Sequence, residues 1–167
     1  DASVTLASGT MLATDGSGAS LTGLPDNTPA FQADFGDTSP TSLADSTWVK
    51  LECDTEVFDT DGDYDNSSTY RFTPTTAGKY YLYLKMSIDS GVNMSYFQLG
   101  LKKNGNWLLR NSVRSNTYEG HYLATVADMN GSSDYIEAFA YQNSGGAVSP
   151  ETGEDFCFWG GYKLIGV

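Results

Sequence analysis

Residues Glu56–Ile88 read EVFDTDGDYDNSSTYRFTPTTAGKYYLYLKMSI, and two structures compete to explain this stretch. Its first half, DTDGDYD, places four aspartates at alternate positions around a glycine, as calcium-binding loops often do. Its second half alternates apolar and polar residues. Successive side chains of a β-strand point to opposite faces, so this alternation predicts a strand over Lys79–Ile88. The apolar face of that strand consists of Tyr80, Leu82, Leu84, Met86 and Ile88.

The opposite face of the predicted strand is polar and aromatic. It consists of Lys79, Tyr81, Tyr83, Lys85 and Ser87. Tyrosines gathered outside a core are enriched at protein interfaces, because the ring is apolar and the hydroxyl finds a partner. The pattern therefore predicts an interface at Tyr81 and Tyr83. The alternative is a half-exposed sheet that carries ordinary tyrosines.

The aspartate-rich half fails the spacing of an EF-hand loop. Such a loop takes acids at positions 1, 3 and 5, a glycine at position 6 and a carboxylate at position 12. Counted from Asp59, the glycine falls at position 4 and position 12 is Tyr70. We therefore expect a turn in which aspartates cap backbone N–H groups, and no metal site. A looser carboxylate site is the alternative.

Outside this stretch, short runs with strand periodicity are separated by turn residues such as Asn104-Gly105, a strong hairpin signal. Their number and spacing predict an all-β sandwich or barrel of about ten strands. The expected strands are Ala30–Phe35, Trp48–Phe58, Ser68–Thr73, Lys79–Ile88, Tyr96–Lys103, Trp107–Val113, Gly120–Met129, Asp134–Tyr141 and Phe156–Ile165.

Residues 1–29 differ from the rest because they are rich in Gly, Ser and Thr and contain few large apolar residues. Such a segment has little with which to form a core. We predict a shaft or linker over residues 1–29 that becomes ordered, if at all, against copies of itself, and a head domain over residues 30–167. Residue 1 is Asp rather than Met, so we expect a processed chain or a fragment.

Charge and reactive residues exclude several functions. The chain has a net charge of −12, which repels phosphate backbones and anionic lipid, so neither nucleic-acid binding nor membrane insertion is expected. Cys53 and Cys157 match no metal spacing and are predicted to be two buried thiols, with a disulfide as the alternative. His121 is the only histidine, and no nucleophile motif or carboxylate pair accompanies it. We predict no enzyme activity and no cofactor.

Several motifs together resemble one family. YDNSSTYRFTPTTAGKYYLYL at Tyr64–Leu84, LGLKKNGN at Leu99–Asn106 and FCFWGGYKLIG at Phe156–Gly166 are similar to the jelly-roll heads of complement component one subcomponent q and the tumour necrosis factor ligands. The resemblance implies a jelly-roll β-sandwich that assembles as a homotrimer around aromatic strand faces. It places Tyr83 and Phe158 at the three-fold axis, and the alternation argument adds Tyr81.

The wording of GSGASLTGLPDNTPAF at Gly16–Phe31, ahead of the jelly-roll motifs, resembles C-terminal domains of structural proteins of tailed phages, especially marine and cyanobacterial ones. This resemblance implies the head of a phage fibre or another virion appendage, exposed outside the virion, joined to it through the N-terminal segment, and binding a host-surface glycan or protein. One alternative is a purely structural capsid or tail decoration domain. Another is a secreted complement-like lectin.

Loops held by a rigid scaffold concentrate function, so we predict host binding at two loops, Asn116–Tyr118 and Asn143–Thr152. Tyr118 would stack on a sugar ring, and Asn116, Asn143 or Glu151 would hydrogen-bond to its hydroxyl groups. The alternative is that both are solvated loops without a ligand.

Overall fold

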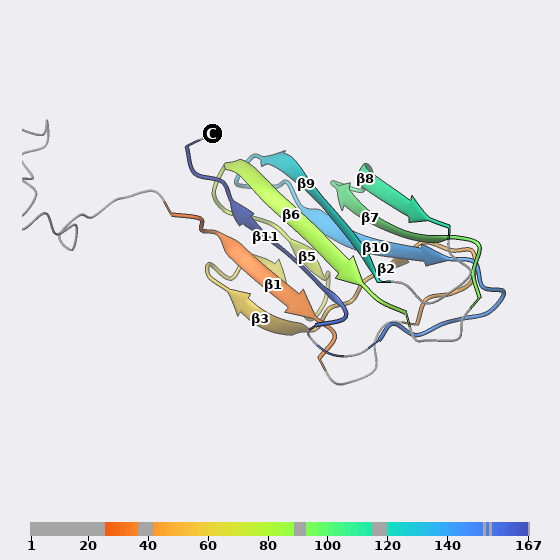
Figure 1. Ribbon diagram of the computed structural model, residues 1–167. Helices are drawn as coiled ribbons and strands as arrows, with labels where there is room; N and C mark the ends of the chain where they lie inside the picture. The colour runs from red at the N-terminus through yellow and green to blue at the C-terminus, as the bar shows by residue number, and fades with distance from the viewer. Residues whose placement is uncertain are drawn as a thin grey trace, which may run out of the picture.

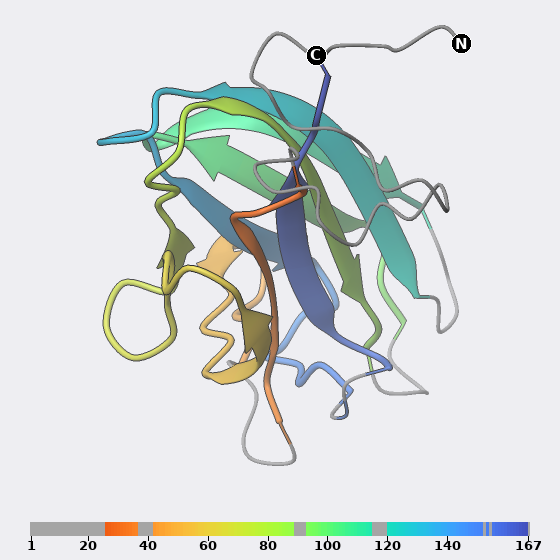
Figure 2. The same cartoon turned by 90° about the vertical axis from the view of Figure 1, so that its left-hand side faces the viewer.

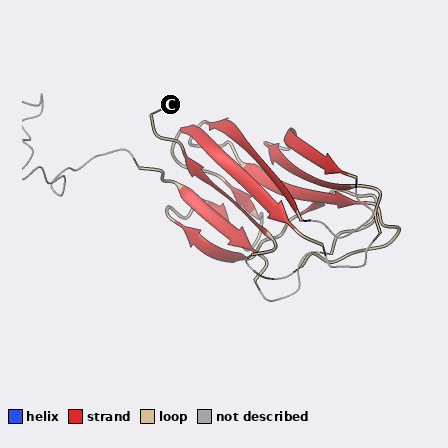
Figure 3. Cartoon of the chain, in the orientation of Figure 1, coloured by secondary structure: helices blue, strands red, loops and turns tan. Residues whose placement is uncertain are grey.

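The computed structural model describes residues 26–36, 42–88, 93–114, 120–151, 153 and 155–166. Strands and loops account for all of these residues, and no helix occurs among them (Figure 3). A helix long and apolar enough to cross a membrane is therefore absent from this part of the chain. The strands are β1 (Ala30–Asp34), β2 (Val49–Lys50), β3 (Thr55–Asp59), β4 (Tyr64–Asp65), β5 (Arg71–Phe72), β6 (Gly78–Met86), β7 (Phe97–Lys103), β8 (Asn106–Val113), β9 (His121–Met129), β10 (Ile136–Gln142) and β11 (Phe158–Lys163).

Two antiparallel sheets form the layers of a sandwich. The first sheet has the order β3-β1-β11-β6-β9, and the second has the order β4-β5-β10-β7-β8, with β2 also paired to β10. Figure 1 shows β1, β11, β6 and β9 side by side in front of the second sheet. Neighbours such as β1 and β11 come from opposite ends of the described chain, so the connections between strands cross from one sheet to the other. The predicted all-β sandwich is confirmed.

Strand β6 shows the alternation of buried and outward-facing side chains that the sequence predicts. Its apolar positions are buried in the core, and Tyr81, Tyr83 and Lys85 between them are half-buried on the outer side. The core also holds a ring cluster in which Phe31 lies 4.3 Å from Phe72 and 4.7 Å from Trp159, measured between ring centroids. Each fully buried side chain of this size contributes about 1.5–3 kcal/mol, so this cluster joins β1, β5 and β11 into one core.

The predicted strand Trp48–Phe58 is wrong as a single element. It divides into β2 and β3, which lie in different sheets, because residues 51–54 cross between the layers. Leu51 and Cys53 are buried during this crossing, and the Leu51 N–H donates to the Ala138 carbonyl at 2.9 Å. The apolar period continues through the crossing, so alternation alone does not reveal the change of sheet.

The predicted strand Ser68–Thr73 shrinks to β5. The Asp65 carboxylate accepts the backbone N–H groups of Ser67, Ser68 and Thr69 at 2.9–3.1 Å and so holds a turn there. The Asp59 carboxylate accepts the N–H groups of Gly62 and Tyr64 in the same way. The predicted aspartate-capped turn is therefore confirmed. Where the structure describes the chain, no group of three or more His, Cys, Asp or Glu side chains is placed to hold a metal ion.

Two further positions bear on the predictions. Ser87 was assigned to the outer face of its strand, but it is buried beyond the end of β6, where its carbonyl accepts the Glu151 N–H at 2.9 Å. Cys53 and Cys157 are both free and buried, which confirms the prediction of two buried thiols. Burial raises the pKa of Cys157 to about 12 and that of Cys53 well above its usual value, so both are inert thiols at neutral pH.

The described chain enters and leaves at one end of the sandwich. The Lys163 N–H donates to the carbonyls of Asn27 and Pro29 at 3.2 and 3.1 Å, and Figure 2 views the molecule from this end. The last residues of β8 and β10 lie at the opposite end, because Val113 and Gln142 both pair with Phe97 at the start of β7. Most of the predicted linker, residues 1–25, lies outside the described residues, so the boundary at residue 29 stays a prediction.

Candidate functional site

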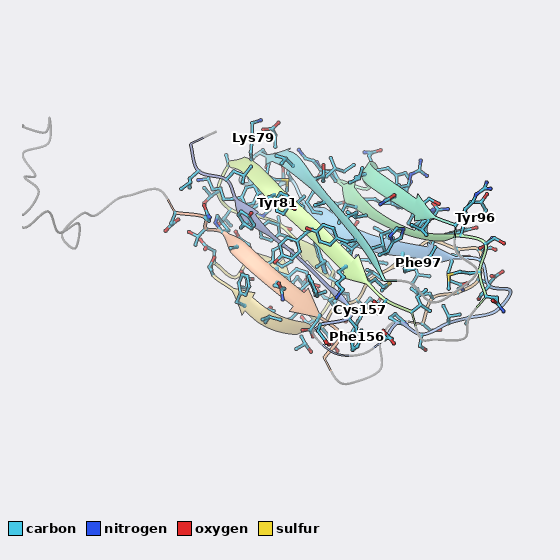
Figure 4. All side chains as sticks on the ribbon, in the orientation of Figure 1. Lys79, Tyr81, Tyr96, Phe97, Phe156 and Cys157 are labelled. Atoms are coloured by element: carbon cyan, nitrogen blue, oxygen red, sulfur yellow. The ribbon has the colours of Figure 1, made fainter. Side chains whose placement is uncertain are left out.

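The outer face of the first sheet carries a group of aromatic side chains that we call the tyrosine face. Its members are Tyr81 and Tyr83 on β6, Tyr122 on β9, and Phe158 and Tyr162 on β11. Register brings them together: Tyr81 pairs with Tyr162, and Tyr122 and Phe158 both pair with Lys85 from opposite sides of β6. Strand alternation then points all five rings away from the core. Figure 4 labels Tyr81 on β6, with Lys79 near the start of the strand.

The rings of the tyrosine face contact one another in a chain. The centroid of Tyr81 lies 5.5 Å from that of Tyr162 and 6.2 Å from that of Tyr83, and Tyr83 lies 6.1 Å from Phe158. These separations fall within the 4.5–7 Å range of favourable aromatic pairs. Each contact restricts the rotamers of the two rings that it joins.

The hydroxyl groups are engaged within the same face. The hydroxyl oxygens of Tyr81 and Tyr122 share a hydrogen bond of 3.0 Å, and the Tyr83 hydroxyl donates to Gln32 Oε1 at 3.0 Å. The bond with Tyr81, followed by burial, raises the pKa of Tyr122 to about 12, and burial raises the pKa of Tyr83. Both groups therefore stay neutral at physiological pH. The face presents apolar rings with neutral hydroxyls, a composition suited to contact with protein.

A glycine lets Tyr83 lie flat on the sheet. Gly160 pairs directly with Tyr83, and a Cβ atom at Gly160 would come within 2.6 Å of the Tyr83 hydroxyl oxygen. The same Cβ would also lie 2.5 Å from the Phe31 carbonyl oxygen. Any larger residue at position 160 would therefore lift the ring and press on the backbone of β1.

Exposed apolar surface concentrates around this sheet. The large hydrophobic side chains that are exposed among the described residues are Val57, Phe58, Tyr122, Val126 and Ile165. Four of them lie on β3 and β9, and Ile165 follows β11, so none comes from the second sheet. Tyr122 is 51% exposed and Val126 is 47% exposed. Apolar side chains that are exposed on one sheet are typical of interaction surfaces.

The structure brings together the three residues that were predicted to form a trimer axis, Tyr81, Tyr83 and Phe158, on one face. Their role at an axis stays a prediction. The sequence analysis did not find Tyr122 and Tyr162. Strand alternation was a usable signal for each. Tyr122 directly precedes Leu123, which is buried, and Tyr162 stands two residues after Gly160, on the same side of the strand. Their position beside Tyr81, however, depends on the pairing of distant strands.

Only part of the predicted ligand-binding set can be placed. Asn116 and Tyr118 lie outside the described residues. Asn143 and Glu151 lie in the segment that follows β10, at the end away from Asn27. The Asn143 Oδ1 atom accepts the Tyr96 N–H at 2.7 Å, so this side chain holds the loop against the start of β7. Their role in binding stays a prediction.

Comparisons with known proteins identify the fold. No protein-family model matches the chain, and no curated protein matches it. Several solved structures do. The crystal structure of murine APRIL at pH 5.0 is 17% identical with a TM-score of 0.60, over 81% of this chain and 98% of that chain. Eiger TNF from S. frugiperda is 12% identical with a TM-score of 0.61, over 85% and 96%.

The globular domain of the zebrafish complement 1qA protein is similar as well. It is 16% identical with a TM-score of 0.60, over 84% of this chain and 98% of that chain. In each of the three comparisons, this chain matches 96–98% of the other protein's chain. The chain therefore has the jelly-roll fold of tumour necrosis factor and complement globular domains, as the sequence motifs implied. Identities this low establish the fold alone.

Proposed function

We propose that this protein is the non-enzymatic, homotrimeric head of a phage fibre or another virion appendage, and that it binds a glycan or protein on the host surface. The observation that carries the proposal is the tyrosine face, where four rings contact one another, Tyr122 joins them through its hydroxyl group, and exposed apolar side chains lie on the same sheet. In a trimer, neighbouring copies of the chain would cover these rings. The jelly-roll fold supports three-fold assembly, which the sequence resemblance implies.

The orientation of the sandwich supports a role in attachment. The chain enters beside Lys163 at one end, and the loops that contain Asn143 and Glu151 lie at the other. A head fixed to the virion through its N-terminal segment would present this second end to the host. Three identical heads held together bind at high effective concentration, so weak individual sites suffice for attachment.

Light scattering on the full chain tests the assembly. We expect a trimer at micromolar concentration, and we expect Tyr83→Asp to dissociate it, because a trimer would bring three carboxylates around a dry axis at a cost of several kcal/mol per ion. Tyr122→Asp, at a position that is 51% exposed, should dissociate it too without loss of the fold. Tyr135→Asp, directly before β10, is the control outside the first sheet and should stay trimeric.

A stable monomer of the unmodified chain would contradict the proposed assembly, provided that circular dichroism shows the sandwich intact. Binding of the trimer to host cells tests the second half of the proposal. A trimer that binds no host cell would favour the alternative of a structural decoration domain. Light scattering judges the assembly and host-cell binding judges the attachment, and the same preparation serves both measurements.

A further inference from the structure

The second sheet also carries aromatic rings on its outer side, and there they are mixed with cations. We call this group the tryptophan face. Its members are Trp48 beside β2, Lys102 on β7, Trp107 and Arg110 on β8, and Phe139 and Tyr141 on β10. Strand β10 buries Ile136, Ala138 and Ala140 in the core, so Phe139 and Tyr141 between them point outward.

The rings of the tryptophan face form one connected surface. The ring centroids of Trp48 and Trp107 lie 4.4 Å apart. Trp48 lies 5.6 Å from Tyr141, and Trp107 lies 5.7 Å from Phe139. All four rings are half-buried, so each packs on the sheet while part of it meets solvent. The result is a platform of rings that spans β2, β10, β7 and β8.

Gly100 on β7 makes room for this platform. It pairs with Phe139 on one side and with Arg110 on the other. A Cβ atom at this position would come within 2.6 Å of Trp107 Cζ3 and 3.3 Å of Arg110 Cγ. The indole ring and the stem of the arginine therefore lie over the glycine, close to the backbone.

Two cations lie on these rings without a carboxylate partner. Lys102 Nζ lies 4.6 Å from the Trp107 centroid and 4.3 Å from the Phe139 centroid, and Arg110 Cζ lies 5.1 Å from the Trp107 centroid. Among the residues that the structure describes, neither forms an ion pair, whereas Lys50 pairs with Glu137 at 2.7 Å. An ammonium has three N–H donors, so two ring faces leave at least one for an anionic oxygen.

This concentration of positive charge contrasts with the whole chain, which has a net charge of −12 and only nine Lys and Arg residues. Six of the nine lie on, or directly after, strands of the second sheet: Lys50, Arg71, Lys102, Lys103, Arg110 and Arg114. The remaining three belong to β6 and β11. Two of the six are neutralised by carboxylates, Lys50 by Glu137 and Lys103 by Asp134. Lys102 and Arg110 are therefore the cations of the tryptophan face that remain to attract an anionic ligand.

A hollow beside the platform offers further polar groups. It measures about 580 Å³ and lies along edge strand β8, where Trp107 and Arg110 meet Gln98, Asn111 and Ser112. The hollow is open to solvent, and Leu108 and Leu109 complete its lining. Amide, guanidinium and hydroxyl groups at one place can hydrogen-bond to several oxygens of one ligand.

We infer that the tryptophan face binds an acidic glycan, a chain of sugars that carry carboxylates. The apolar C–H face of a sugar ring would pack on Trp107 and Trp48, and a carboxylate would bind Arg110 and Lys102. The hydroxyl groups would reach Gln98, Asn111 and Ser112 in the hollow. This inference supplies the ligand class for the attachment part of the proposed function, and it needs neither the trimer nor the loops at the end of the sandwich.

The sparse charge of such a glycan fits this surface better than denser polyanions do. A nucleic acid carries a phosphate on every residue, and the net charge of −12 would repel most of them. An acidic peptide matches the cations but has no flat apolar face for the two tryptophans. The ring platform therefore favours sugars over peptide.

Calorimetry with the full chain tests the inference, with an oligosaccharide of neutral hexoses that carries a single glucuronic acid as the probe and its carboxyl-reduced form as the neutral control. We expect the acidic oligomer to bind and the neutral form to bind at least about tenfold more weakly, since a charged hydrogen bond is worth about one factor of ten or more. Arg110→Gln and Lys102→Gln should each weaken binding about tenfold. Lys79→Gln, which removes the same charge from the first sheet, should leave it unchanged.

Absence of binding by the acidic oligomer would overturn the inference, as would equal binding of the neutral form. Equal affinity for a glutamate hexamer would assign the face to acidic peptides instead. Undiminished binding by the Arg110→Gln, Lys102→Gln double variant would remove this site. The same titration with Tyr122→Asp separates the two proposals, because glycan binding should persist in a monomer and its loss there would contradict the independence of the face.

Discussion

The two outer faces of this sandwich use one backbone device for different chemistry. In each sheet an aromatic ring lies over a glycine of the neighbouring strand, Tyr83 over Gly160 and Trp107 over Gly100. The tyrosine face then joins its rings through neutral hydroxyl groups and is bordered by exposed apolar side chains. The tryptophan face joins its rings through Lys102 and Arg110. The tyrosine face also carries one cation, Lys85, whose Nζ lies 5.7 Å from the Phe158 centroid and donates to the Asp155 carbonyl. Rings joined by neutral hydroxyl groups suit a protein partner, and rings joined by cations suit an anionic ligand.

The glycine under each face has a different kind of neighbour, and Gly160→Ala should have the largest effect on the free energy of unfolding. The new Cβ would lie 2.5 Å from the Phe31 carbonyl oxygen, which belongs to the backbone and cannot rotate away. We expect a loss of about 3 kcal/mol in the free energy of unfolding, the upper end for overpacking. Urea denaturation measures it, and a loss below about 1 kcal/mol would mean that β1 yields more easily than its packing implies.

Gly100→Ala should cost less, about 1 kcal/mol. Here the new Cβ would meet only side chains, the Trp107 ring and the Arg110 stem, and these can move outward into solvent. Tryptophan fluorescence should change, because Trp107 would leave its contact with Trp48, while the free energy of unfolding changes little. Equal losses of stability in the two glycine variants would contradict the expectation that a backbone neighbour resists a new Cβ more than a side-chain neighbour does.

Much of the first face follows from the sequence, because period-two alternation in Lys79–Ile88 is a local signal. It predicts the buried side of β6 and the outward direction of Tyr81 and Tyr83. Tyr122 and Tyr162 escape such an argument, since only the register of β9 and β11 against β6 brings them alongside. A local pattern predicts which way a side chain points, but its neighbours depend on how distant strands pair.

The second face was not predicted from the sequence, and the reason is similar. Trp48 lies at the start of a run that the sequence presents as one strand, whereas β2 and β3 belong to different sheets. Only the pairing of Val49 and Lys50 with β10 brings Trp48 to Tyr141 and Trp107. The jelly-roll class itself was predictable because its turn and strand motifs are local. The face was not, because it is assembled from four strands.

Alkaline pH should affect the tyrosine face. Tyr122 has a pKa of about 12 in the folded chain against an ordinary 10.0, chiefly because of its hydrogen bond with Tyr81. A folded-state pKa that is raised gives stability that is fully present below pH 10 and lost as pH rises through about 12. Tyr122→Phe should therefore lose less stability than the unmodified chain between pH 10 and 12. Thermal unfolding across that interval measures the difference, and equally steep losses would contradict the assignment.

Chelation should have the smallest effect, and it tests whether the tyrosine face is truly independent of charge. The carboxylates of Asp59 and Asp65 are occupied by backbone N–H groups of their own turn, so EDTA should change the free energy of unfolding by less than about 0.5 kcal/mol. The trimer should also persist in EDTA, because contact between neutral tyrosines needs no cation.

The net charge of −12 makes this a demanding test, since divalent cations bound between protomers could relieve their mutual repulsion. Light scattering with and without EDTA, at constant ionic strength, separates the two effects. Dissociation by EDTA that magnesium reverses would show that charge controls assembly on the first sheet as well. The difference between the two faces would then lie only in the sign of the ion that each one needs.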